Sequence, residues 1–161
     1  MPSFLIPRTG RKVSVVLVSS VQERHAVLRQ VAKALGWELT QCTTCRAGLD
    51  CLNQNHPPVV VCDDQLSDGD WKTVMEAVHK LEVRPNVVVV SVSPADSLWA
   101  ETLNWGAYDL LISPYNAGEV YRLITLAWEA KQRQLAPPAP KKPIAARYEA
   151  AAAVQPAVRH A

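Results

Sequence analysis

Between residues 13 and 134 the chain alternates short apolar segments with longer amphipathic ones. Five short segments, most of them rich in Val and Leu and bounded by turn residues, predict β-strands at 13–18, 37–42, 59–63, 87–91 and 108–112. Each is followed by apolar residues at helical spacing, which predicts helices at 23–35, 45–54, 71–81, 94–105 and 116–134. Strict β-α alternation favours an α/β fold, with a doubly wound five-stranded parallel sheet and helices on both faces.

The two ends of the chain do not share this pattern. Residues 1–12 form a short N-terminal extension before the predicted domain, which spans 13–134. Residues 135–161 contain five prolines and ten alanines, and few large apolar side chains. Such a segment cannot bury enough apolar surface to offset the entropy of ordering it, so we expect a disordered Pro/Ala-rich C-terminal tail.

The distribution of charge and of apolar residues limits the kinds of partner that the chain is expected to bind. The net charge is +2, but residues 135–161 alone carry +3, so the predicted domain has no basic excess and nucleic-acid binding is not expected. No apolar run reaches the 18 or so residues of a membrane span. The N-terminus lacks the apolar core and small-residue cleavage site of a secretory signal, so we expect a cytoplasmic protein without a membrane partner.

The four cysteines allow two interpretations. Cys42 and Cys45 have the CxxC spacing of redox and zinc sites, and Cys51 would be a possible third ligand. A second CxxC or HxxxH pair is absent. We therefore favour ordinary buried thiols, and no metal site is expected.

One acidic residue stands where a parallel sheet presents reactive groups. Asp63 ends the apolar run 59–62, and a polar turn containing Asp64 and Asp70 follows it. A buried strand that delivers a carboxylate to its carboxyl end places that carboxylate at the edge where α/β proteins bind ligands. Asp63 is therefore the first candidate for a functional residue.

Together with the five βα units, three motifs resemble the receiver domain of two-component response regulators over roughly residues 13–134. Asp63 lies seven residues before Asp70, Ser91 falls where strand four of that family carries a hydroxyl, and 106–115 is similar to its Gly-Ala-x-Asp-…-Lys-Pro-Phe segment. The resemblance implies a flavodoxin-like sheet with strand order 2-1-3-4-5. It also implies that Asp63 occupies the phosphoacceptor position.

The family's other phosphotransfer groups are replaced in this chain. The resemblance implies that an acidic pair holding Mg²⁺ aligns with Ser19 and Ser20, that a phosphate-binding lysine aligns with Ser113, and that the aromatic switch residue aligns with Leu110. Mg²⁺ prefers anionic oxygen, so we expect weak or absent Mg²⁺ binding and no cofactor. Asp63 would instead face hydroxyls, those of Ser19, Ser20, Ser91 and Ser113, which can donate hydrogen bonds to it.

We accordingly interpret the chain as an atypical, stand-alone receiver that acts in phosphorelay signalling through protein docking, without efficient Mg²⁺-dependent phosphorylation and without enzyme activity. The resemblance implies a docking surface on helix four, strand five and helix five, for a histidine kinase, a downstream effector or a second copy of the chain. Aromatic candidates for that interface are Trp99, Trp105, Tyr121 and Trp128. For Tyr121 and Trp128 a position at the flank of the core is an equal alternative.

Two other functions remain open. Asp63 is a working phosphoacceptor if the hydroxyls and Asp64 suffice for the chemistry. The chain is a flavodoxin-like ligand-binding module if Ser19 and Ser20 begin a phosphate-binding loop, although no glycine follows them.

Overall fold

The computed structural model describes residues 12–93 and 95–135. The remaining residues, which include most of the predicted N-terminal extension and of the Pro/Ala-rich tail, lie outside the described part. The elements are β1 Ser14–Val18, η1 Gln22–His25, α1 Ala26–Leu35, β2 Glu38–Cys42, α2 Cys45–Asn55, β3 Val59–Asp63, β4 Gln65–Leu66, β5 Gly69–Asp70, α3 Trp71–His79, β6 Asn86–Ser91, α4 Asp96–Asn104, β7 Asp109–Ile112 and α5 Ala117–Leu135.

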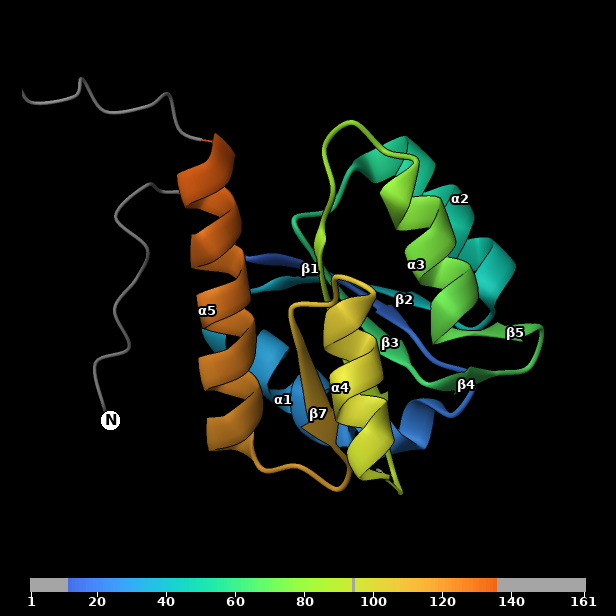
Figure 1. The fold of residues 1–161 in the computed structure, drawn as a ribbon. Coiled ribbons are helices and arrows are strands. Elements are labelled where there is room, and N and C mark those ends of the chain that lie inside the picture. Colours follow the sequence, from blue (N-terminus) through green and yellow to red (C-terminus); the bar gives the residue numbers. More distant parts are fainter. Residues whose placement is uncertain (1–11, 94, 136–161) are drawn as a thin grey trace, which may run out of the picture.

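Five parallel strands form the central sheet in the order β2-β1-β3-β6-β7 (Figure 1). This is the predicted order 2-1-3-4-5, and the α/β prediction is confirmed. Strands β1, β3 and β6 are buried on both faces, which explains their near-continuous runs of valine.

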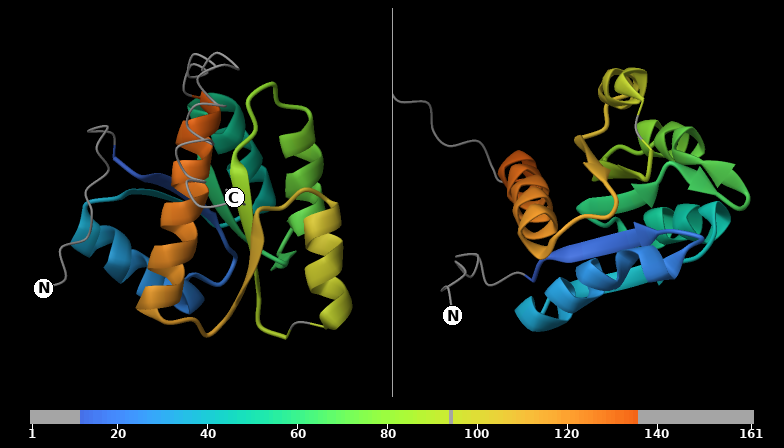
Figure 2. Two further views of the ribbon diagram at one scale, coloured as in Figure 1. Left: turned by 60° about the vertical axis from the view of Figure 1, so that its left-hand side comes forward. Right: turned by 90° about the horizontal axis from the view of Figure 1, so that it is seen from below.

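Side chains alternate along these strands and divide the core into two layers. Val15, Leu17 and Val61 pack with α1 and α5 on one face. Val16, Val60 and Val89 pack with α2, α3 and residues of α4 on the other face. Figure 2 shows the helices on both sides of the twisted sheet.

Local sequence signals set the helix ends. Gly36 adopts φ +68 and ends α1, a left-handed conformation that glycine adopts without strain. Asp70 begins α3 with a capping box, since its carboxylate accepts from the backbone N–H of Thr73 while the Thr73 side chain bonds the N–H of Asp70. The Asp70 cap fixes where α3 leaves the carboxyl edge of the sheet, and the turn at Gly36 leads the chain back into the start of β2.

Two local features were not predicted from the sequence. The segment after Asp63, expected as a simple turn, contains the short antiparallel ribbon of β4 and β5. A short 3-10 turn, η1, also precedes α1 where one continuous helix was expected. Both lie at the carboxyl edge, and η1 supplies Arg24 and His25, two of the side chains that reach Asp63.

Candidate functional site

Asp63 is the last residue of β3, and its side chain is fully buried at the carboxyl edge of the central strand. The strand lies between β1 and β6. Immediately after it, the N–H of Asp64 donates to the carbonyl of Val90 at 2.8 Å, which holds the chain against β6. The carboxylate thus points into the interior at the sheet edge where it was expected.

Three side chains occupy both oxygens of this carboxylate. The Ser19 hydroxyl donates to Oδ2 at 2.5 Å, and Arg24 Nη1 lies 3.2 Å from the same oxygen. His25 Nε2 lies 2.7 Å from Oδ1. Ser19 and His25 are fully buried, whereas the Arg24 side chain is 21% exposed. Both carboxylate oxygens of Asp63 therefore have internal hydrogen-bond partners.

The network continues from His25 to Tyr115. The two side chains meet at 2.7 Å between His25 Nδ1 and the Tyr115 hydroxyl. Burial, and after it the Asp63 charge, raises the pKa of Tyr115, so the phenol stays protonated. His25 thus bridges the Tyr115 hydroxyl at Nδ1 and the Asp63 carboxylate at Nε2, and the carboxylate oxygen is the acceptor of the second bond. A buried chain of Tyr115, His25 and Asp63 therefore joins the β7–α5 junction to the central strand.

Neither Arg24 nor His25 was among the predicted site residues. A signal for His25 was present in the sequence, because it stands three residues before Leu28 on the apolar face of its helical segment. A polar residue on an apolar face needs a buried partner, and here Asp63 and Tyr115 provide it. No comparable pattern singled out Arg24.

Of the predicted serines, Ser19 is the one whose hydroxyl bonds Asp63. Ser20 points away from the carboxylate, since neighbouring side chains leaving a strand alternate in direction. Its hydroxyl donates to the Thr43 carbonyl at 3.0 Å and accepts from the Ser67 N–H at 2.9 Å. Ser20 thus ties the end of β1 to the loop after β2 and to the β4–β5 ribbon.

Ser91 and Ser113 are buried, but their bonds are made to the backbone. The Ser91 hydroxyl accepts from the Ser93 N–H at 3.3 Å, and the Ser113 N–H donates to the Ser91 carbonyl at 2.8 Å. Among the described residues, no hydrogen bond joins either serine, or Ser20, to Asp63. The sequence predicted four hydroxyls around Asp63. The structure instead places one hydroxyl, one imidazole and one guanidinium against its carboxylate.

The four aromatic interface candidates have different surroundings. Trp99 on α4 is 55% exposed. Trp105 packs edge-on against Trp71 at 5.7 Å between ring centroids, and Tyr121 stacks on Trp37 at 6.3 Å. Both are therefore partly engaged within the fold.

The assignment of Trp128 to an interface is wrong. Its side chain is 3% exposed and belongs to the core between α5 and the sheet. α5 packs on α1 as well as on the sheet, which widens its buried face beyond the predicted stripe. This contact covers the position that the helical angle placed at the flank.

The donors around Asp63 are poorly suited to a divalent cation. Ser19 is neutral, and the Arg24 guanidinium already lies against Oδ2 and would repel a second cation. In residues 12–93 and 95–135 no group of three or more His, Cys, Asp or Glu side chains has the arrangement to hold a metal ion. All four cysteines are buried and free, as the sequence interpretation favoured.

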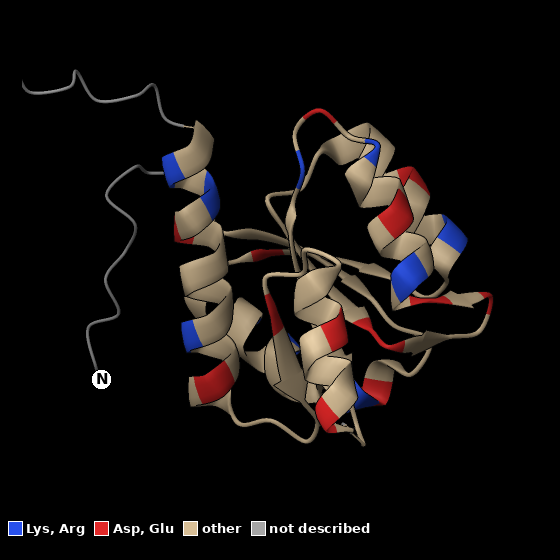
Figure 3. Ribbon diagram, viewed as in Figure 1, with Lys and Arg blue, Asp and Glu red and all other residues tan. Residues whose placement is uncertain are grey.

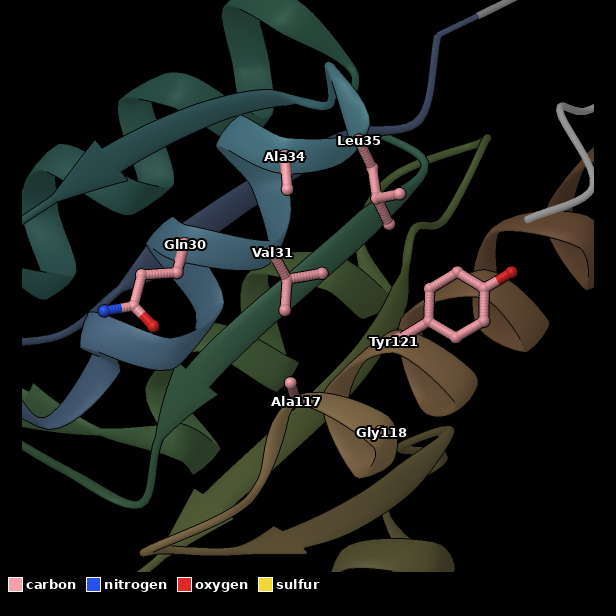
Figure 4. A pocket seen from close by; sticks show the side chains of 7 residues that line it. All are labelled: Gln30, Val31, Ala34, Leu35, Ala117, Gly118 and Tyr121. Carbon is pink, nitrogen blue, oxygen red and sulfur yellow. The ribbon is translucent and has the colours of Figure 1, made fainter. Parts of the chain in front are cut away.

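A separate cavity of about 330 Å³ lies between α1 and α5, away from Asp63 (Figure 4). Its wall is mostly apolar and consists of Gln30, Val31, Ala34, Leu35, Ala117, Gly118 and Tyr121. None of the side chains that bond Asp63 contributes to it. The ligand-module interpretation placed its site at Ser19 and Ser20, and this cavity lies elsewhere.

Two further properties of the helices are the distribution of their charged residues and their hydropathy. In Figure 3 acidic and basic positions are interspersed over α2 and α3, while the charged positions of α4 are acidic. Within the described ranges, no helix combines the length and the hydropathy needed to cross a bilayer.

Comparison with known proteins places this geometry in a family. No protein-family model matches the chain. A curated relative, the photosynthetic apparatus regulatory protein RegA of Rhodobacter capsulatus, is 30% identical over 129 residues, which are 78% of this chain and 67% of RegA.

Solved structures agree on the fold. A signal receiver domain of a putative Luxo repressor protein from Vibrio parahaemolyticus matches with TM-score 0.73 and 18% identity, over 77% of this chain and 95% of that one. A CheY-like receiver domain from Methanospirillum hungatei matches with TM-score 0.69 and 18% identity, over 77% and 99%. The beryllofluoride-activated NtrC4 receiver domain dimer matches with TM-score 0.68 and 19% identity, over 73% and 98%. The sheet order, the aspartate at the end of the central strand and the similarity to RegA agree with one another. The chain belongs to the receiver domains of two-component response regulators.

Proposed function

We propose that this receiver signals by docking to other proteins, and that Asp63 holds the carboxyl edge of the sheet together and does not serve as an efficient phosphoacceptor. The observation that carries the proposal is the complete engagement of Asp63. Its side chain is fully buried, and Ser19, Arg24 and His25 bond both of its oxygens.

Phosphoryl transfer to a carboxylate requires a free oxygen in line with phosphorus, and positive charge to neutralise the developing transition state. The oxygens of Asp63 are already committed to internal donors. Arg24 neutralises the carboxylate from within the fold, so the site has little remaining attraction for Mg²⁺. The charge balance of the site is thus satisfied without either metal or phosphate, and Mg²⁺ binding is weak.

The surface formed by α4 and β7 is the docking surface in this proposal. Trp99 is 55% exposed there, and Val92 and Ile112 at the ends of β6 and β7 are 53% and 49% exposed. An exposed aromatic residue and exposed aliphatic residues on elements that pack together, α4 and β7, have the composition of an interface hot spot. The partner is a histidine kinase, a downstream effector or a second copy. The likeness to an NtrC4 receiver dimer supports the last of these.

Incubation with Mg²⁺ and phosphoramidate, followed by intact mass measurement at neutral pH, tests the proposal. We expect no phosphoryl adduct on the wild-type chain under conditions that phosphorylate a conventional receiver run in parallel. An adduct that the Asp63→Asn variant lacks would establish the alternative, in which Arg24 supplies the transition-state cation and Asp63 is a working phosphoacceptor. An adduct that persists in Asp63→Asn would lie at another residue and would leave the proposal standing.

A further inference from the structure

The apolar cavity between α1 and α5, here called the α1–α5 groove, takes no part in the Asp63 network. Its volume is about 330 Å³, and it opens to solvent because Ala34 on α1 and Ala117 and Gly118 on α5 are exposed. In Figure 4 the side chains of Val31 and Ala117 lie opposite each other across this space. A volume of this size is at the small end of the range in which proteins bind compact apolar groups.

Small residues keep the groove open. Ala34 and Ala117 have only a methyl group to place in it, and Gly118 has no side chain. A Cβ added at Gly118 would meet only Asn116 Oδ1, at 3.3 Å, so the space beside this part of α5 is otherwise empty of side chains. The two helices thus leave an apolar surface between them that a few aliphatic or aromatic side chains would fill.

The described chain begins beside one end of this groove. Val13 is buried in the same core layer as Val31, and its carbonyl accepts from the Glu38 N–H at 2.8 Å. Trp37, the residue before Glu38, stacks on Tyr121 of the groove at 6.3 Å between ring centroids. The residues that precede Lys12 therefore join the fold next to the groove.

Those preceding residues contain a suitable apolar segment. Phe4, Leu5 and Ile6 form the one run of three large apolar residues outside the described ranges. From Ile6 to Lys12 an extended chain spans up to about 20 Å. The groove is shorter than this, since α1 rises only about 7.5 Å from Gln30 to Leu35. The connecting residues are therefore long enough for the run to reach any part of the groove.

We propose that Phe4, Leu5 and Ile6 dock in the α1–α5 groove of their own molecule. Docking removes apolar surface from water on both the segment and the groove. The short connection to β1 makes the binding intramolecular, with an effective concentration of the order of millimolar, so even a weak site is occupied.

Two other occupants are less well matched to the groove. A second copy of the chain lacks the advantage of the short connection. The segment 136–161 has its large apolar residues singly, at Ile144, Tyr148, Val154 and Val158, and presents no compact group.

A docked segment also covers this face of the receiver. Another protein reaches the groove only by displacing Phe4, Leu5 and Ile6. The α1–α5 groove lies away from Asp63, so this contact does not depend on whether Asp63 accepts a phosphoryl group.

A methyl NOESY spectrum of the full-length, isotope-labelled wild-type chain tests the proposal without any variant. We expect NOEs from the methyl groups of Leu5 and Ile6 to the Tyr121 ring and the Val31 methyl groups, unchanged on dilution. The absence of these NOEs would overturn the proposal. So would groove NOEs from residues 136–161, or NOEs that appear only between differently labelled copies in an isotope-filtered spectrum.

One substitution in the groove and a matched control test the location. Ala117→Glu introduces a carboxylate into the apolar groove at an exposed position in the first turn of α5, where the helix favours negative charge. It should abolish the NOEs from Leu5 and Ile6. Ala47→Glu makes the same change at an exposed position in the first turn of α2, on the other face of the sheet, and should retain them. Retention in Ala117→Glu, or loss in Ala47→Glu, would refute docking in the groove, and the wild-type spectrum decides the question if a variant fails to fold.

Discussion

Replacing Asp63 by alanine is the sharpest test of its role as a structural anchor. In a site built around a reactive carboxylate, removal of the buried charge relieves a desolvation cost and leaves stability equal or higher. Here the same removal deprives three donors of their acceptor. The sign of the change in unfolding free energy therefore separates the two interpretations.

The expected magnitude follows from the burial of those donors. His25 is fully buried and would be left with an unsatisfied donor at a cost of about 1–3 kcal/mol, whereas the Ser19 hydroxyl can still donate to the Val21 carbonyl at 3.0 Å. The Arg24 side chain is 21% exposed and can turn to water, so it adds little. Relief of the carboxylate's own desolvation offsets part of this cost. We expect Asp63→Ala to lower the unfolding free energy by about 1–3 kcal/mol.

Urea unfolding monitored by circular dichroism and tryptophan fluorescence measures this change through the midpoint at constant slope. Asp64→Ala is a matched control, because Asp64 is the adjacent aspartate and its hydrogen bonds in the described structure are made by the backbone. It should change stability by less than about 0.5 kcal/mol. Asp63→Asn, which keeps one acceptor oxygen, should fall between the two. An unchanged or raised midpoint for Asp63→Ala would refute the anchor.

Three further predictions concern other parts of the fold. Tyr115→Phe should lower stability by about 1 kcal/mol and shift the His25 Nδ1 resonance in nitrogen NMR, since it removes the hydrogen-bond partner of that atom. Trp128→Ala should lower the unfolding free energy by about 3–5 kcal/mol in urea unfolding, because Trp128 is buried. Trp99→Ala should change stability little and should weaken partner or self-association by about 1–3 kcal/mol in calorimetry. The reverse pattern would argue against the α4–β7 docking surface. The backbone N–H groups of Arg46 and Cys45 lower the pKa of Asp68, so its stabilisation is present above the unfolded-state pKa and is lost as the pH falls through the folded-state pKa. Asp68→Asn should therefore destabilise the protein at neutral pH and match the wild type in acid, as unfolding at both pH values would show.

The fold was accessible from sequence because its signals are local. Runs such as 87–90, four consecutive valines, indicate strands buried on both faces, and Gly36 and Asp70 mark helix ends by their own chemistry. The β4–β5 ribbon escaped prediction because two-residue strands carry no periodicity.

The site was only partly accessible because its contacts are long-range. Asp63 was found from its place at the end of a strand, but His25 lies 38 residues before it and Tyr115 lies 90 residues after His25. Alignment to the family's motifs indicated which groups were missing at Ser19, Ser20 and Ser113. It could not show which side chains had taken over their electrostatic role, since Arg24 and His25 lie outside those motifs.

Ser19 shows how such long-range contacts meet at one point of the site. Its N–H donates to the Cys42 carbonyl at 2.9 Å and its hydroxyl donates to Asp63, so this residue joins the ends of β1, β2 and β3. If Asp63 acts as a structural anchor, as proposed, removing its carboxylate loosens this junction, and the unfolding midpoint of Asp63→Ala reports that loss.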